Sequence, residues 1–317
     1  MLSTAERYLA NDKRTHQSIE TDAGTPDGFA LLAVLGFLMV VSSLLIIFTT
    51  SSRVKLLTSN TRYSDARLGY AAEAINAIIA RRIAADVAVA HGDGAWVSGL
   101  SVRCRFGQTE LYTQVQPHSG LIDLNTAGQD LLQVGFAALK FDAAEASSLA
   151  RAVAEYRSVG SRSDPTDQAA MPTEAGLKHG PYEDVSELND FAAMRRVSLG
   201  DLARVFTVYG KRSTLDMRAA PEAITNAMAS ASPDNALASQ TGTSSDVFTI
   251  ETTIRDSGFS QYRGDIYGIG SAGAPFAKKL SILPSDGLVP PIAAPGSTNC
   301  DALLEPRVVD LFRAVFQ

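Results

Sequence analysis

The residue types that most often carry out chemistry are few in this sequence and widely spaced. The H-E-x-x-H, G-x-S-x-G and Walker A sequences of zinc proteases, hydrolases and P-loop proteins do not occur in it. Its four histidines show no metal-binding spacing: His16, His91, His118 and His179. We therefore expect a protein that is not an enzyme and that requires no cofactor.

One segment has the spacing of a dinucleotide-binding loop. Residues 268–273 (GIGSAG) match G-x-G-x-x-G and follow a predicted strand. That motif needs a helix whose N-terminus faces the pyrophosphate within a βαβ unit, but Pro275 comes almost at once and a short strand follows it. A glycine-rich hairpin connection or loop explains the segment better.

The two cysteines, Cys104 and Cys300, lie far apart in the sequence and form neither a local zinc knuckle nor a C-x-x-C redox pair. A disulfide and a pair of free thiols both remain open. A body outside the cytoplasm would favour the disulfide, because such compartments are oxidising. Closing so long a loop would stabilise the fold by up to about 4 to 5 kcal/mol in the chain-entropy model.

The composition is that of a folded protein with no general attraction for polyanions. With 317 residues, 45% hydrophobic and 20% charged, the chain has room for one large domain or two smaller ones. A net charge of −6 without a long run of Lys or Arg gives none of the positive field that captures phosphates. We expect no nucleic-acid partner.

A long uncharged segment lies near the N-terminus. No charged residue occurs from Gly28 to Ser52, and Phe29 to Phe48 gives roughly 20 mostly apolar positions, enough to cross a bilayer as a helix. A buried core helix seldom runs this far without a charge, and a cleaved secretory signal usually has a shorter apolar region. The sequence predicts a single membrane span.

The helical pattern continues beyond the span. Apolar residues recur three or four positions apart, which is the spacing of one helix face: Leu68, Ala72, Ile75, Ile79, Ile83 and Val87. Arg81 and Arg82 fall on the other side. We predict one long helix that leaves the membrane and packs on a domain.

The rest of the chain alternates between strand and helix signals. Strands are predicted at 96–106, 110–115, 247–255, 262–269 and 277–283. Helices are expected after Thr126, Asp142 and Ser198, because each precedes a polar partner by three positions, as capping residues do. The segment 158–181 has the composition of a long loop, and Asp123-Leu124-Asn125-Thr126-Ala127 is echoed from Asp216 onward.

Residues 28–33 (GFALLA) resemble the type IV prepilin signature, in which a leader ending in Gly is cut before Phe. The fifth mature residue in that signature is usually Glu, but here it is Ala33. The subtype that lacks this Glu is the minor pseudopilin K of type II secretion systems. The resemblance implies cleavage between Gly28 and Phe29 by a prepilin peptidase and methylation of the new Phe29 amine.

Three later segments resemble the same family, in the same order. They are 120–127 (GLIDLNTA), 181–188 (PYEDVSEL) and 206–221, which contains FTVYG and LDMRAAP. The resemblance implies an α+β, pilin-like fold, in which a long N-terminal helix packs on a small antiparallel sheet and a large helical domain is inserted. The implied regions are a leader (1–28), the transmembrane half of the helix (29–52), a pilin-like domain (53–120 and 211–283), the inserted domain (121–210) and a C-terminal tail (284–317).

The function implied by the resemblance is assembly. A minor pseudopilin of this type caps the periplasmic pseudopilus of a type II secretion system and helps to initiate it. Its partners would be the minor pseudopilins I and J, the prepilin peptidase, the pseudopilus and the inner-membrane assembly platform. It would be a single-pass protein of the inner membrane with a periplasmic C-terminal domain.

Members of that family can bind calcium in the inserted domain. Asp164, Asp167 and Glu174 are the candidate ligands here, because hard cations favour several oxygen ligands on flexible backbone. Solvated acidic side chains in a loop are the alternative.

Two other functions remain open. The 123–127 segment, with a helix ending at Arg157, also resembles the helix-hairpin-helix of DNA-uptake receptors, although the Gly-x-Gly turn is replaced by Ala138 to Asp142. A minor pilin of a type IV pilus would differ mainly in lacking the inserted domain. In addition, the leader is more acidic than basic and Arg53 and Lys55 follow the span, so flanking charge alone favours the opposite orientation.

Overall fold

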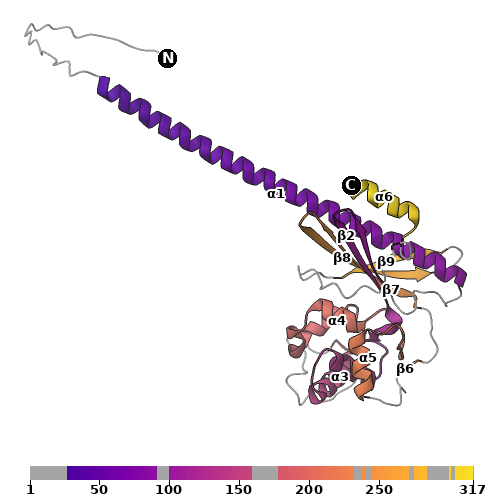
Figure 1. The fold of residues 1–317 in the computed structure, drawn as a ribbon. Helices are drawn as coiled ribbons and strands as arrows, with labels where there is room; N and C mark the ends of the chain where they lie inside the picture. Colours follow the sequence, from indigo (N-terminus) through magenta and orange to yellow (C-terminus); the bar gives the residue numbers. More distant parts are fainter. Residues whose placement is uncertain are drawn as a thin grey trace, which may run out of the picture. The chain divides into compact units, whose positions relative to one another are not determined.

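The computed structural model describes residues 27–90, 100–158, 178–231, 238–239, 245–270, 275–283, 300 and 304–316. The chain divides into two compact units, the first ending at Thr61 and the second running from Arg62 to Gln317. Helix α1, Asp27–Ala90, is continuous over both. Figure 1 shows the described elements in sequence colours.

The part of α1 in the first unit carries the predicted apolar span. The helix from Phe29 is long and apolar enough to cross a membrane, and none of its most apolar window is buried within the protein. Its hydroxyl groups are satisfied within the helix: Ser43 Oγ donates to the Met39 carbonyl at 2.8 Å, and Thr49 Oγ1 to the Leu45 carbonyl at 2.9 Å. Neither hydroxyl group therefore needs a water molecule as its hydrogen-bond acceptor.

In the second unit, α1 packs on a sheet through the predicted face. Leu68, Ala72, Ile75, Ile79 and Ile83 are all buried, and Val87 is half-buried against the same core. Arg81 is exposed, as the helical spacing predicts. The prediction of an amphipathic continuation of the membrane helix is confirmed.

The sheet has five antiparallel strands in the order β1-β2-β7-β8-β9. Their bounds are Leu100–Phe106, Thr109–Pro117, Val247–Asp256, Phe259–Gly270 and Phe276–Ile282. The turn between β7 and β8 has positive φ at Ser257 (48°) and Gly258 (89°), which suits the twist of a two-residue hairpin. The predicted α+β class and the strand pairs are confirmed, and residues 96–99 of the first predicted strand lie outside the described residues.

A helical part is inserted between β2 and β7. In chain order it contains η2 (His118–Gly120), β3 (Ile122–Asp123), α2 (Gln129–Ala138), α3 (Ala143–Arg157), η4 (Val185–Asp190), η5 (Ala192–Arg196), α4 (Leu199–Val205), β4 (Phe206–Thr207), β5 (Leu215–Asp216), α5 (Glu222–Ala231) and β6 (Ala238–Ser239). Its core is separate from that of the sheet, and in Figure 1 its helices gather to one side of the strands.

The helical part extends further than the sequence indicates. Leu215, Ile224 and Met228 are fully buried in its core, so that core continues through α5, beyond the predicted limit at residue 210. The sequence pattern ends the insertion where strand-like residues reappear, but β5 is a two-residue strand that pairs with β6 rather than with the main sheet.

Two of the three predicted helix caps are confirmed. Asp142 accepts from the backbone N–H of Glu145 at 2.8 Å, and Ser198 from that of Asp201 at 3.1 Å. The prediction for Thr126 is wrong, because α2 is preceded by Gly128 and has no side-chain cap. The Thr126 hydroxyl instead contacts the Asp123 carboxylate at 3.1 Å and the Arg212 carbonyl at 2.5 Å.

The echo between the segments at Asp123 and Asp216 is structural. Each aspartate ends a two-residue strand in a parallel pair, is buried, and accepts from the backbone N–H two residues on, at 2.8 Å and 3.1 Å. Each therefore forms the turn that precedes a helix, α2 or α5. The short side chain closes the turn locally, which explains the residue type at both positions.

The predicted C-terminal tail contains a helix. α6, Pro306–Phe316, packs beside α1 through Val309 and Phe312, and the Phe312 ring stacks on Phe106 of β1 with ring centroids 6.3 Å apart. The apolar spacing of Val309 and Phe312 after Pro306 indicates this helix. The prediction of a C-terminal tail did not include it.

A buried polar cluster fixes α1 on the sheet. Asp265 of β8 is fully buried and accepts from Asn76 Nδ2 of α1 at 2.9 Å. Its carboxylate also lies 3.0 Å from Arg263 Nε and 3.0 Å from Lys279 Nζ. The hydrogen bond from Lys279, at 2.6 Å, lowers the pKa of Glu73 on α1. Apolar packing alone would allow α1 to slide or rotate, and these directional contacts select one position.

Replacing Asp265 tests this role. Asp265→Ala leaves two cations and a buried amide without their shared acceptor, so we expect the free energy of unfolding to fall by about 3 kcal/mol or more. Denaturation of the full chain in detergent micelles, followed by circular dichroism, measures it. The exposed Asp246→Ala serves as control and should change stability by less than about 0.5 kcal/mol. Equal effects of the two substitutions would contradict the role given to Asp265.

Candidate functional site

The first candidate site is the apolar surface of α1. Gly28 is the second residue of the helix, and Phe29 and Ala33 lie on its exposed surface, with Phe29 80% exposed. A Cβ added at Gly36 would meet no atom within 4 Å. The surface is uncharged and apolar on all sides, so it suits lipid and the close approach of other helices rather than any catalytic step. Cleavage after Gly28 and methylation of Phe29 stay predictions.

The two cysteines are brought together. Cys104 of β1 and Cys300 form a disulfide with their Cα atoms 5.5 Å apart. Cys104 is buried in the core of the sheet, and Cys300 packs against the same core just before α6. The bond therefore holds the start of the C-terminal helix against β1. Because it closes a loop of 196 residues, it stabilises the fold by restricting the unfolded chain.

The predicted calcium ligands are not brought together in any described geometry. Asp164, Asp167 and Glu174 all lie outside the described residues. Within the ranges that the structure does describe, no group of three or more His, Cys, Asp or Glu side chains is arranged to hold a metal ion. Calcium binding through those three residues stays a prediction.

Residues 268–270 of the glycine-rich segment belong to the antiparallel sheet, and residues 271–273 lie outside the described residues. Gly268 and Gly270 are the last residues of β8, which pairs antiparallel with both β7 and β9. A Cβ at Gly270 would lie 2.2 Å from the Phe276 ring. The glycines are therefore explained by side chains that cross them, and this antiparallel setting lacks the βαβ unit that a dinucleotide site needs.

The turn between α2 and α3 differs from a phosphate-binding hairpin. Lys140 has a positive φ of 67°, and Phe141 is buried beneath the Arg196 guanidinium, 4.3 Å from the ring centroid. A turn that binds a phosphate on backbone N–H groups needs those groups free. The backbone N–H groups of Leu139, Lys140 and Phe141 instead donate to carbonyls of α2, which disfavours the DNA-uptake alternative.

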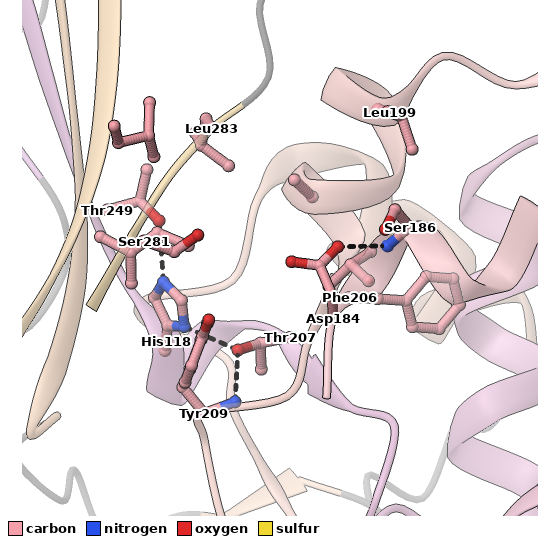
Figure 2. Close-up of a pocket in the computed structure, with 14 residues that line it drawn as sticks. His118, Asp184, Ser186, Leu199, Phe206, Thr207, Tyr209, Thr249, Ser281 and Leu283 are labelled. Carbon is pink, nitrogen blue, oxygen red and sulfur yellow. Dashed lines mark hydrogen bonds between the residues drawn. The ribbon is translucent and has the colours of Figure 1, made fainter. Parts of the chain in front are cut away.

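The second candidate site is the junction where the chain leaves and re-enters the sheet. A cavity of about 30 Å³ lies there, lined by His118, Thr207 and Tyr209 together with residues of η4, α4, β7 and β9. Figure 2 shows these lining residues. The end of β2 touches the turn before α5: Gln116 Nε2 donates to the Ala219 carbonyl at 2.8 Å. A Cβ at Gly120 would lie 2.1 Å from that same carbonyl oxygen, so only glycine fits.

His118 joins the helical part to the sheet. Its Nδ1 lies 2.7 Å from Thr207 Oγ1 of β4, and its Nε2 lies 2.8 Å from Thr249 Oγ1 of β7. The ring is fully buried, and this burial lowers its pKa to about 3. At neutral pH the imidazole is therefore a neutral hydrogen-bonding link between two hydroxyl groups. Sequence reasoning found no role for it, since neither threonine is near it in sequence.

The sequence did not predict a role for Asn76 either, although its position beside the apolar stripe of α1 is unusual for a polar residue. It is a polar residue directly after Ile75 in a stripe that is otherwise apolar, and it is fully buried. A buried polar side chain on a helix face requires a partner on the opposing element. The identity of that partner, Asp265, could not be read from local sequence.

Comparison with known proteins gives a likeness in structure alone. No protein-family model and no curated protein matches the chain. A solved structure, the crystal structure of the GspK-GspI-GspJ complex from the enterotoxigenic Escherichia coli type 2 secretion system, contains a similar chain. The TM-score is 0.42 and the identity 12%, over 73% of this chain and 99% of the other.

Acid should destabilise the junction through His118. In the unfolded chain His118 is protonated below its ordinary pKa of about 6.5, whereas in the folded chain it stays neutral down to about pH 3. The free energy of unfolding should therefore fall by up to about 1.4 kcal/mol per pH unit in that window. Denaturation curves of the full chain from pH 7 to pH 4 measure this slope.

His118→Gln keeps hydrogen-bonding atoms but does not titrate. The difference in free energy of unfolding between the unchanged protein and this variant should therefore shrink by about 3 kcal/mol from pH 7 to pH 4. The exposed His179→Gln is the matched control and should run parallel to the unchanged protein. A constant gap for His118→Gln would show that His118 does not stay neutral in the folded state.

Proposed function

We propose that this chain is a minor pseudopilin that caps the tip of the periplasmic pseudopilus of a type II secretion system and helps to initiate its assembly. The observation that carries the proposal is α1. Its uncharged, exposed surface begins at Phe29, directly after Gly28, and the same helix continues as a face buried on an antiparallel sheet. A helix of this kind joins a membrane anchor to an assembly domain.

The processing follows from the prepilin-like residues. A prepilin peptidase would remove residues 1–28, and the new amine of Phe29 would be methylated. The span would then hold the chain once in the inner membrane, with the sheet and the helical part in the periplasm. The disulfide between Cys104 and Cys300 supports this location, because structural disulfides persist in oxidising compartments.

The position at the tip is supported by two features of the chain. Ala33 lacks the carboxylate that a fibre subunit is thought to offer to its neighbour's N-terminal ammonium, and a subunit at the tip has no neighbour above it. The helical part between β2 and β7 has a core of its own, and so large an insertion would block further stacking. The role is structural, with no catalytic residue, no required cofactor and no nucleic-acid partner.

The partners would be the minor pseudopilins I and J, bound through packed N-terminal helices, together with the assembly platform. Close helix packing in lipid favours small residues at the contact. Gly36 and Ser43 supply them on α1, and the space around Gly36 is open.

Co-expression tests this assignment. We expect the full chain to purify from detergent extracts with tagged minor pseudopilins I and J of the same system. Gly36→Leu should reduce recovery of the complex several-fold, because the added side chain separates helix backbones without touching any other part of this chain. The control is Leu38→Met, which changes an exposed residue on the opposite side of the helix and conserves volume.

Two results would count against the proposal. One is recovery of the chain with I and J no better than that of an unrelated single-span protein. The other is unchanged recovery of the complex with Gly36→Leu, which would show that packing of the N-terminal helices at Gly36 does not hold the partners together.

A further inference from the structure

Strand β9 exposes a row of large apolar side chains. Phe276 and Leu280 are 49% and 39% exposed and lie on one face of the strand, over Gly270 and Gly268 of β8. Ile282 is 50% exposed, follows a β-bulge at Leu280 and stands opposite Asp265. Among the described residues outside α1, the other large apolar side chain with comparable exposure is Leu311 on α6. Exposed apolar side chains are therefore concentrated on this strand, which marks it as an interaction surface.

β9 is also an edge of the sheet. It pairs with β8 on one side and stands last in the strand order, so its other side pairs with no other described strand. Backbone N–H and C=O groups along such an edge are a template for one more strand. Edge strands are usually blunted by charge, a bulge, proline or brevity, and β9 has Lys278 and a β-bulge at Leu280. The edge therefore favours an added strand that complements this lysine and pairs with the regular stretch before the bulge.

The glycines of β8 shape the surface beneath this row. The Phe276 ring crosses Gly270, and Leu280 crosses Gly268, where an added Cβ would lie 3.3 Å from a Leu280 methyl carbon. Side chains at these two positions would push Phe276 and Leu280 away from the sheet. The glycines thus let both apolar side chains lie flat and form a low, continuous contact surface.

The surroundings of the row are cationic. Lys278 lies between Phe276 and Leu280 on the same exposed face, whereas Lys279 points the other way and is bound to Asp265 and Glu73. Leu280 also lines a cavity of about 290 Å³, whose charged lining residues are two cations and one anion: Lys211, Arg212 and Asp246. In a chain of net charge −6 this is a local positive, apolar surface.

We propose that the edge of β9 binds an extended segment of a partner protein, which adds as a sixth strand to the five-stranded sheet. The segment presents apolar side chains to Phe276 and Leu280 and an acidic side chain to Lys278 on the same face. Backbone hydrogen bonds provide affinity in such an arrangement and side chains provide selection. The proposal does not rest on the function proposed above, because it uses no part of α1.

A second copy of the chain fits this edge less well. Antiparallel pairing of β9 with itself about its middle would place Lys278 opposite Lys278, or Lys279 opposite Lys279, depending on register. Like charges directly opposite each other destabilise a strand pair. The charge of the edge therefore favours a different chain that carries an acidic residue.

Two short extended peptides test the proposal. Both carry valine at alternate positions, and one has a glutamate and the other a lysine at the centre of the same face. Fluorescence anisotropy with the full chain in detergent micelles at low salt should show about fivefold to tenfold tighter binding of the glutamate peptide. Lys278→Glu should reverse this preference, and Leu280→Ser should lower the affinity for both peptides at least several-fold.

The controls separate strand addition from loss of fold or simple stickiness. Leu311→Ser removes an exposed leucine from α6 and should leave peptide binding unchanged. A glutamate peptide with proline at one strand position lacks a backbone donor and should bind more weakly. Equal binding of both peptides, no binding of either, or no reversal in Lys278→Glu would overturn the proposal. The proposal would also be overturned if sedimentation showed that the unchanged protein forms dimers and that Leu280→Ser does not, because β9 would then bind a second copy of the chain.

Discussion

The contact of Asp265 with Asn76, Arg263 and Lys279 determines how the sheet is held against α1. The apolar stripe of α1 supplies most of the buried area, but apolar contact is not directional and fixes neither the rotation nor the register of a helix. Of the partners of Asp265, Asn76 comes from α1, whereas Arg263 and Lys279 come from β8 and β9 and also contact Glu73 of α1. Any other position of the helix would break the Asn76–Asp265 bond in a buried site and separate Glu73 from both cations. Every element that depends on the sheet inherits its position along α1 from this cluster.

The helical part depends on a second, smaller set of contacts. The chain leaves the sheet at His118 and returns to it at β7, and the bonds of His118 and Gln116 tie this crossing to Thr207 and Ala219 of the helical part and to Thr249 of β7. The neutral imidazole can serve both hydroxyl groups because burial excludes its charged form. A large insertion with its own core is thereby joined to the sheet by a few short contacts, and the strand pairing of the sheet is left intact.

Local pattern predicted most of the elements and few of the contacts between them. The stripe from Leu68 to Ile83 and the caps at Asp142 and Ser198 rest on spacing within one element, which a single sequence carries. Thr126 failed as a cap because its hydroxyl bonds to a residue far along the chain, Arg212. The partners of Asn76 and His118, and the place of α5 in the helical core, depend on the same kind of long-range contact.

The proposed function depends on α1 being made as a prepilin helix, from which a peptidase removes residues 1–28. Intact-mass measurement and N-terminal sequencing of the full chain, expressed with and without a prepilin peptidase, test it most directly. The account predicts a mature chain that begins at Phe29 only when the peptidase is present. Retention of residues 1–28 in the presence of an active peptidase would contradict it, and the chain would then be an ordinary single-span protein.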